Sequence, residues 1–174
     1  MSPLAALTAI LLGSAIAITT GLLMVLAVLA SLAPLSWRPL LLLGFAASFS
    51  AKLADTFGSE IGKRWGRRTV LITSLRPVPP GTEGAVSLEG TAASLVGGGL
   101  MAAVMLVLGL LAGWRAWLLV SIVALLATLL ESLIGATAQR RWEWLSNELV
   151  NGLQTGLAAL LAIAAQLALA KPMG

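Results

Sequence analysis

Long apolar runs separated by short polar connections dominate the hydrophobic pattern of the chain. Five runs of about 22–29 residues stand out, and each is long enough to cross a membrane core of roughly 30 Å as a helix. The connections carry proline, glycine and basic residues, which are typical of helix ends and turns. The pattern predicts an all-α, polytopic membrane helix bundle that forms a single domain over residues 1–174. The five predicted spans are 4–32, 38–62, 86–112, 117–138 and 144–170.

The composition supports a membrane protein and restricts its chemistry. Hydrophobic residues make up 59% of the chain and charged residues 10%, against roughly 25% charged residues in ordinary soluble domains. So little polar surface cannot enclose a soluble core, and so apolar a chain is not a disordered one. The absence of Cys and His excludes thiol nucleophiles, disulfides, Cys/His zinc sites and imidazole catalysis. A metal would need oxygen ligands, which favours a hard cation such as Mg²⁺.

The distribution of basic residues predicts the orientation of the bundle. The run at 4–32 is too long for a signal-peptide core and lacks a basic n-region, so we expect a retained span. With the N-terminus inside, the connections after the second and fourth spans are cytoplasmic and hold seven of the eleven Lys and Arg residues. The positive-inside rule therefore predicts an N-in, C-out topology. Basic residues that flank apolar spans favour lipid headgroups or a phosphorylated ligand over nucleic acid.

Polar and ionisable side chains recur inside three of the spans at helical spacing. A charge within a span costs about 2.5–3.5 kcal/mol on the insertion scale, so such residues usually face the bundle interior and mark a functional site. Residues three or four positions apart share one face of a helix, and each set forms a stripe. The stripes are Ser48, Lys52, Asp55 and Ser59; Thr128, Glu131 and Gly135, with Ser132 beside them; and Asn147, Asn151 and Gln154, broadened by Glu148 and Thr155.

All three stripes lie toward the predicted cytoplasmic ends of their spans, so we expect them at similar depth. Lys52 and Asp55 can pair, and carboxylates and amides from facing helices can hold a divalent cation. The alternatives are ion pairs that only join helices, side chains that reach the membrane interface, and an ion path in an ion-coupled transporter or channel. Polar stripes confined to one end favour a site, since an ion path runs through the full thickness.

The connection at 63–84 supplies groups suited to phosphate. It is polar and rich in proline, so it is predicted to be a loop. Arg76 precedes a proline segment and the turn Gly81-Thr82-Glu83-Gly84, which is expected to open the next helix. Amide groups at a helix start attract phosphate, and arginine binds it in fork geometry. Alone, this segment also fits a plain turn with an N-cap. The nearby basic residues likewise fit an orientation signal; they are Lys63, Arg64, Arg67 and Arg68.

Together, the stripes and the loop indicate a phosphate-handling site at the cytoplasmic face. In such sites Mg²⁺ neutralises the phosphates and basic groups position them, so the protein supplies little covalent chemistry. The apolar bundle beside the site is suited to an isoprenoid or acyl tail.

Five segments also resemble a known family. They are 46–63, with Asp-Thr followed by Ser-Glu-x-Gly, and 71–73, 78–91, 131–136 and 147–151. In combination they resemble the integral membrane family that includes the plastid phytyl-phosphate kinase of tocopherol synthesis and an animal transmembrane homologue. The form without long insertions is similar to cyanobacterial members. Family members usually begin with further spans, so a chain starting at Met1-Ser2-Pro3 is expected to be a short member, a truncated one or a reduced paralogue.

The resemblance implies an enzyme, a phosphotransferase that converts phytyl monophosphate to phytyl diphosphate. It implies a nucleoside triphosphate donor, with CTP expected, and a role in salvage of phytol released from chlorophyll. The expected location is a bacterial plasma or thylakoid membrane, with the site on the cytoplasmic face. The expected partners are membrane lipid, the prenyl phosphate and the nucleotide. A homo-oligomer is also possible, because the glycines at 97–99 allow close packing either within the bundle or between subunits.

The residues at matching positions are assigned three hypothetical roles. The expected catalytic residues are Lys52, Asp55, Ser59 and Glu60. Mg²⁺ is expected at Asp55, Glu60, Glu131, Asn147 and Asn151. Phosphate and nucleotide binding is expected at Lys63, Arg76, Gly81, Thr82, Glu83 and Gly84.

Overall fold

The computed structural model describes residues 31–139, 141, 142 and 144–170. Within these residues, four helices are long and apolar enough to cross a membrane, and they coincide with four of the predicted spans. The predicted span at 4–32 lies outside the described residues except for its last two positions. The all-α membrane bundle is confirmed as the fold class, while the N-in orientation stays a prediction.

Most helices begin and end within about three residues of their predicted boundaries, whereas the helix Leu88–Val107 ends five residues before the predicted position 112. Pro39 lies in the first turn of the first described helix. Proline has no amide hydrogen, and amides in the first turn of a helix have no carbonyl partner within the helix, so no hydrogen bond is lost. That helix ends three residues beyond the predicted position, with Lys63 and Arg64 in its last turn, where positive charge interacts favourably with the helix dipole. The helices are α2 (Arg38–Trp65), α3 (Leu88–Val107), α4 (Trp114–Ile134), continued by the π-helical turn η1 (Gly135–Gln139), and α5 (Asn147–Ala170).

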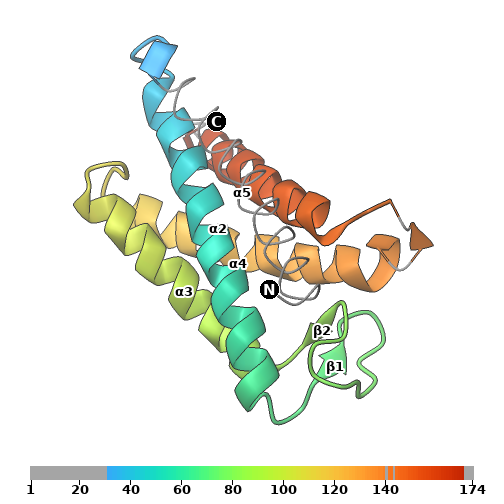
Figure 1. Ribbon diagram of the computed structural model, residues 1–174. Helices are drawn as coiled ribbons and strands as arrows, with labels where there is room; N and C mark the ends of the chain where they lie inside the picture. The colour runs from blue at the N-terminus through green and yellow to red at the C-terminus, as the bar shows by residue number, and fades with distance from the viewer. Residues whose placement is uncertain (1–30, 140, 143, 171–174) are drawn as a thin grey trace, which may run out of the picture.

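Helix α2 is the centre of the bundle and packs against α3, α4 and α5 (Figure 1). The chain runs along α2, returns along α3, and then runs along α4 and back along α5. As a result, the C-terminal ends of α2 and α4 and the N-terminal ends of α3 and α5 gather at one end of the molecule. This end also carries the segment that joins α2 to α3.

Small side chains fill the interior of the bundle and allow its helices to approach closely. A Cβ atom added at Gly97 of α3 would lie 2.9 Å from the Leu53 carbonyl oxygen and from Phe57 Cβ, both on α2. Gly97 and Gly98 are buried, so these two glycines pack within the bundle. The fully buried alanines of α2 are Ala46, Ala47, Ala51 and Ala54.

The segment between α2 and α3 forms a small antiparallel sheet, although the sequence predicts only a loop there. Strand β1 (Val70–Leu71) pairs with β2 (Ala85–Val86), with Val70 opposite Val86. The expectation that the turn at 81–84 opens the next helix is wrong, because β2 lies between the turn and α3. Instead, Ser87 caps α3 by accepting a hydrogen bond of 3.1 Å from the Gly90 amide.

The close approach of α2 and α3 predicts different effects for two substitutions in one glycine run. Gly97→Ala is expected to lower the stability of the bundle by about 1–3 kcal/mol, because its methyl group meets α2 backbone. Gly99→Ala is the matched control, since the nearest atoms to its Cβ lie 3.7 Å and 3.9 Å away. Thermal unfolding in detergent, followed by tryptophan fluorescence, measures both. Equal melting temperatures for the two variants would contradict this packing.

Candidate functional site

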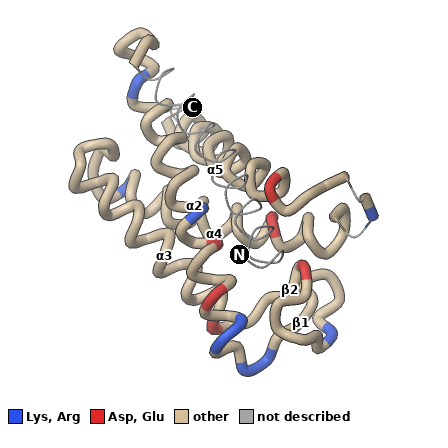
Figure 2. Tube along the Cα trace, in the orientation of Figure 1, with Lys and Arg blue, Asp and Glu red and all other residues tan. Residues whose placement is uncertain are grey.

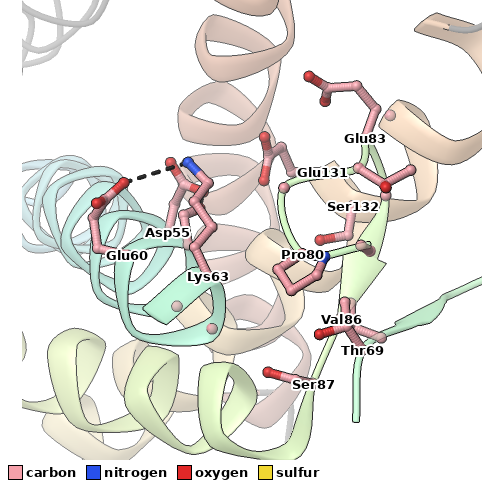
Figure 3. Close-up of a pocket in the computed structure, with 18 of the residues that line it drawn as sticks. Asp55, Glu60, Lys63, Thr69, Pro80, Glu83, Val86, Ser87, Glu131 and Ser132 are labelled. Carbon is pink, nitrogen blue, oxygen red and sulfur yellow. Dashed lines mark hydrogen bonds and ion pairs between the residues drawn. The ribbon is translucent and has the colours of Figure 1, made fainter. Parts of the chain in front are cut away.

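A polar cavity of about 310 Å³ lies at the end of the bundle that carries the sheet (Figure 3). Helices α2, α4 and α5 contribute side chains to its wall, and the segment 80–87 closes it from the other side. Because two carboxylates from different helices lie inside it, we call it the carboxylate cavity. Most of the sequence-predicted site residues line it: Asp55, Ser59, Glu60, Lys63, Gly81, Thr82, Glu83, Gly84, Glu131, Asn147 and Asn151.

Asp55 is the most enclosed carboxylate of the cavity, being 9% exposed. One of its oxygens, Oδ2, accepts a hydrogen bond from Lys52 Nζ at 2.8 Å, and Oδ1 accepts one from Ser59 Oγ at 3.2 Å. All three residues lie on the stripe predicted for α2. The helical spacing of four, three and four therefore produces a carboxylate that is held in one orientation.

Lys52 does not line the cavity but lies behind Asp55 and joins two helices. Its ammonium group also donates to Asn151 Oδ1 of α5, at 2.7 Å. The same cation thus orients an acid and an amide that both face the cavity. Its charge offsets part of the cost of placing Asp55 in a buried position.

Glu131 faces these groups from α4. It is half-buried, and its carboxylate is close enough to Asp55 and Lys52 to interact electrostatically with both. Figure 3 shows it turned across the cavity toward α2. Two carboxyl groups from different helices thus face each other beside one ammonium group.

The oxygen donors of this cavity fit a hard cation with few protein ligands. In the part of the chain described, no group of three or more Asp or Glu side chains is arranged to hold a metal ion. Asp55 and Glu131 are two carboxylates, and Asn147, Asn151 and Ser132 are further oxygen donors on the same wall. Mg²⁺ usually binds one or two carboxylates and completes its coordination with water and substrate phosphates.

Glu60 and Lys63 lie at the rim of the cavity. They form an ion pair of 3.3 Å, and both side chains are exposed (72% and 53%) (Figure 3). An exposed pair of this kind contributes little stability, so both groups can rearrange toward a ligand. Glu60 and Asn147 are the two predicted metal ligands that are exposed.

The turn at 81–84 reaches the cavity without presenting a helix N-terminus. The Thr82 hydroxyl donates to the Pro79 carbonyl at 2.7 Å, which stabilises the turn. Gly84 has a φ of +75°, and any Cβ there would collide with Ala136 of η1. The turn is therefore anchored on the end of α4 by close backbone packing.

Arg76 is the predicted phosphate ligand that the structure places away from the carboxylate cavity. Its carbonyl accepts a hydrogen bond from the Leu71 amide at 3.0 Å, which closes a tight turn at the outer end of the sheet. Leu75, directly before it, has a φ of +55°. Arg76 is exposed and does not line this cavity, so its expected contact with phosphate stays a prediction.

The deeper residues of the three stripes join helices instead of lining the cavity. Gln154 is completely buried, and its Nε2 donates to the Ala51 carbonyl and to Thr128 Oγ1, both at 3.3 Å. Ser48 Oγ donates to the Thr155 carbonyl at 2.9 Å. The contacts that join the helices here are hydrogen bonds between uncharged groups, not the ion pairs of the alternative interpretation.

Several cavity residues were not predicted from the sequence. Thr69, Val86 and Ser87 line the cavity only because β1 and β2 pair and bring their segments to the end of α2. Strands of two residues leave no periodic signal. Of these three residues, only Ser87 has a recognisable signal in the sequence, because a serine directly before an apolar run is typical of a helix start.

Comparisons with known proteins identify relatives over most of the chain. An uncharacterized membrane protein of Synechocystis sp. is 50% identical over 130 residues, which are 75% of this chain and 50% of the relative. Protein VTE6, chloroplastic, of Arabidopsis thaliana is 43% identical over 126 residues, 71% of this chain and 38% of the relative. An uncharacterized membrane protein of Methanocaldococcus jannaschii is 28% identical over 152 residues, 84% of this chain and 59% of the relative.

The chain thus spans between 38% and 59% of the length of these relatives. No solved structure matches it. The family described as "Integral membrane protein DUF92" matches residues 4–159. This match confirms the resemblance inferred from the sequence segments, and the chain belongs to the DUF92 family of integral membrane proteins.

Proposed function

We propose that the chain is a membrane phosphotransferase that phosphorylates an isoprenoid monophosphate, with phytyl phosphate as the acceptor. A nucleoside triphosphate, with CTP expected, is the donor, and Mg²⁺ is the metal. One observation carries the proposal. Asp55 and Glu131, from two different helices, face each other across one polar cavity at the end of an apolar bundle. The resemblance to the phytyl-phosphate kinase family supplies the substrate.

The surroundings of the cavity suit an acceptor with a long apolar tail. The helices of the bundle carry exposed leucines on their outward faces, such as Leu100 of α3, Leu126 of α4 and Leu153 of α5. Such faces are compatible with lipid, so a phytyl chain can remain in the membrane while its phosphate enters the polar cavity. On the predicted topology, that cavity opens toward the cytoplasm, where nucleotides are available.

Asp55 and Glu131 are the residues that would hold Mg²⁺, with Asn147 and Asn151 as additional oxygen donors. The metal would neutralise charge on the phosphates while they approach one another. Lys52 keeps Asp55 and Asn151 oriented, and Lys63 at the rim provides an ammonium group for an incoming phosphate.

The chemistry needs no covalent intermediate on the protein. An oxygen of the prenyl monophosphate forms a bond to the terminal phosphorus of the nucleotide. The bond between that phosphorus and the bridging oxygen breaks, and the nucleoside diphosphate leaves. Catalysis then depends on bringing two anions together in the correct orientation, which is the task of a preorganised polar cavity.

The transporter or channel alternative is less compatible with the interior of the bundle. An ion path needs polar groups through the full thickness of the membrane. On α2, the buried residues before Ser48 are all apolar: Leu43, Gly44, Ala46 and Ala47. The buried polar residues of the central helix therefore stop about halfway along it.

A substrate screen tests the proposal directly. The purified full chain in detergent, supplied with Mg²⁺, is expected to convert phytyl monophosphate to phytyl diphosphate, with CTP faster than ATP, GTP or UTP. Farnesyl and geranylgeranyl monophosphates in the same screen report the preferred tail. Ion flux into sealed vesicles, with no turnover under any of these conditions, would contradict the kinase and favour the transporter.

Asp55→Asn is expected to reduce turnover by about 100-fold or more, because it removes the charge of the most enclosed carboxylate while keeping its shape. Glu89→Gln in α3 is the matched control, since Glu89 does not line the cavity. The assay is phytyl diphosphate formation, with thermal unfolding to verify that both variants fold. Full activity in Asp55→Asn would remove this residue from the site.

Glu131→Gln is expected to raise the Mg²⁺ concentration needed for half-maximal turnover by at least about tenfold, because one of two carboxylates near the metal loses its charge. Turnover should recover in part at high Mg²⁺. Glu148→Gln on α5 serves as the comparison, as Glu148 lies outside the cavity wall. An unchanged Mg²⁺ requirement in Glu131→Gln would mean that this carboxylate does not bind the metal.

A further inference from the structure

A second cavity, of about 570 Å³, lies beyond the end of α2. Among the described residues it is lined by the segment 66–70 and by Leu75, Pro77, Val78 and Pro80, and the two stretches meet where Val70 bridges Pro77. Arg67 and Arg68 contribute to its wall, and no Asp or Glu is among its described lining residues. We call it the arginine cavity. The carboxylate cavity has the opposite character, with four acidic residues on its wall: Asp55, Glu60, Glu83 and Glu131.

The two cavities share part of one wall. Thr69 and Pro80 line both of them, and Figure 3 shows these two residues on the wall of the carboxylate cavity. The backbone of this wall is fixed, because the Val78 amide donates to the Thr69 carbonyl at 3.0 Å. The Thr69 hydroxyl is buried and has no hydrogen-bond partner among the described residues. It is therefore a polar group available to a ligand that passes from one cavity to the other.

The two arginines carry positive charge that the described part of the protein does not neutralise. Arg67 and Arg68 are exposed and form no ion pair with any described residue. The two preceding basic residues do have partners. Lys63 forms an ion pair with Glu60, and the Arg64 guanidinium lies 5.5 Å from the centre of the Trp65 ring. Figure 2 shows the basic residues gathered at the end of α2 and in the segment after it. Adjacent guanidinium groups beside a cavity suit the oxygens of a polyphosphate.

We propose that the arginine cavity binds the polyphosphate of the nucleoside triphosphate donor. This inference rests on the proposed function and divides its two substrates between two cavities. The arginine cavity is built from residues beyond the helices, so it is reached by a water-soluble donor. The carboxylate cavity lies between the helix ends, where the phosphate of a membrane lipid arrives.

In this arrangement the terminal phosphate of the donor extends past Thr69 and Pro80 toward Asp55 and Glu131. The acceptor phosphate attacks the terminal phosphorus there. The bond to the bridging oxygen breaks, and the nucleoside diphosphate stays with the arginines until it leaves. Thr69 can donate its hydroxyl hydrogen to an oxygen of the polyphosphate at the boundary between the cavities.

The test is the double variant Arg67→Ala/Arg68→Ala of the full chain. We expect its KM for the nucleotide to rise by about tenfold or more, with the KM for phytyl phosphate within twofold of the wild type. Arg64→Ala is the matched control, because it removes a charge from the same basic segment without touching either cavity. The variant Arg67→Lys/Arg68→Lys keeps the charge but not the fork geometry, and should give an intermediate KM.

Nucleotide binding without turnover provides a second measurement. Equilibrium dialysis with radiolabelled CTP, ATP, GTP and UTP should show binding to the wild type and to Arg64→Ala, and weaker binding to Arg67→Ala/Arg68→Ala. Binding that depends on the two arginines in a wild type without turnover would support the cavity assignment and contradict the kinase proposal. Turnover with an unchanged nucleotide KM in the double variant would overturn the cavity assignment and leave the kinase proposal standing. An equal loss in Arg64→Ala, or no nucleotide binding by the wild type, would also overturn the assignment.

Discussion

Charge placed among closely packed helices must be compensated, and in this bundle Lys52 provides the compensation. A buried ionised group costs several kcal/mol unless a partner of opposite charge and further hydrogen bonds accompany it. Lys52 donates to Asp55 on its own helix and to Asn151 on α5. The interaction therefore orients a carboxyl group and an amide and joins two helices at one point. The carboxylate cavity exists in its present form because this contact fixes its inner wall.

Close packing elsewhere concentrates the free space at one end. The small alanines of α2 and glycines of α3 let these helices pack in direct contact. Even the methyl group of an alanine at position 97 would collide with the α2 backbone. Where the helices end, α4 continues into a π-helical turn, and Gly84 packs against Ala136 within that turn. Turns of this kind often occur at functional sites, because they change the direction of a helix end. The connection between α2 and α3 is thereby held over the cavity.

Which parts could be predicted from the sequence depends on the range of the interactions involved. Apolar length and helical spacing are local, so four spans and the shared stripe of Lys52, Asp55 and Ser59 could be predicted. The arrival of Glu131 and Asn151 at the same cavity followed from the alternation of helix directions. By contrast, the pairing of two-residue strands depends on contacts between positions about fifteen residues apart. That pairing turned Arg76 outward and brought unpredicted residues to the site. Burial likewise decides which polar stripe residues only join helices, and spacing alone does not reveal it.

The different charges on the walls of the two cavities determine the order in which two phosphate substrates can bind. An anion entering the carboxylate cavity meets a wall with four acidic residues, and a cation that accompanies the anion reduces the repulsion. An anion entering the arginine cavity meets two guanidinium groups that form no ion pair within the described part of the chain, and it is attracted. A polyphosphate that carries Mg²⁺ satisfies both conditions, since its outer oxygens bind the arginines while the metal brings its terminal phosphate toward the carboxylates. Under the proposed function, the donor therefore brings in the metal that allows the acceptor phosphate to enter. The acceptor then reaches the carboxylate cavity from the membrane, while the donor stays in the arginine cavity.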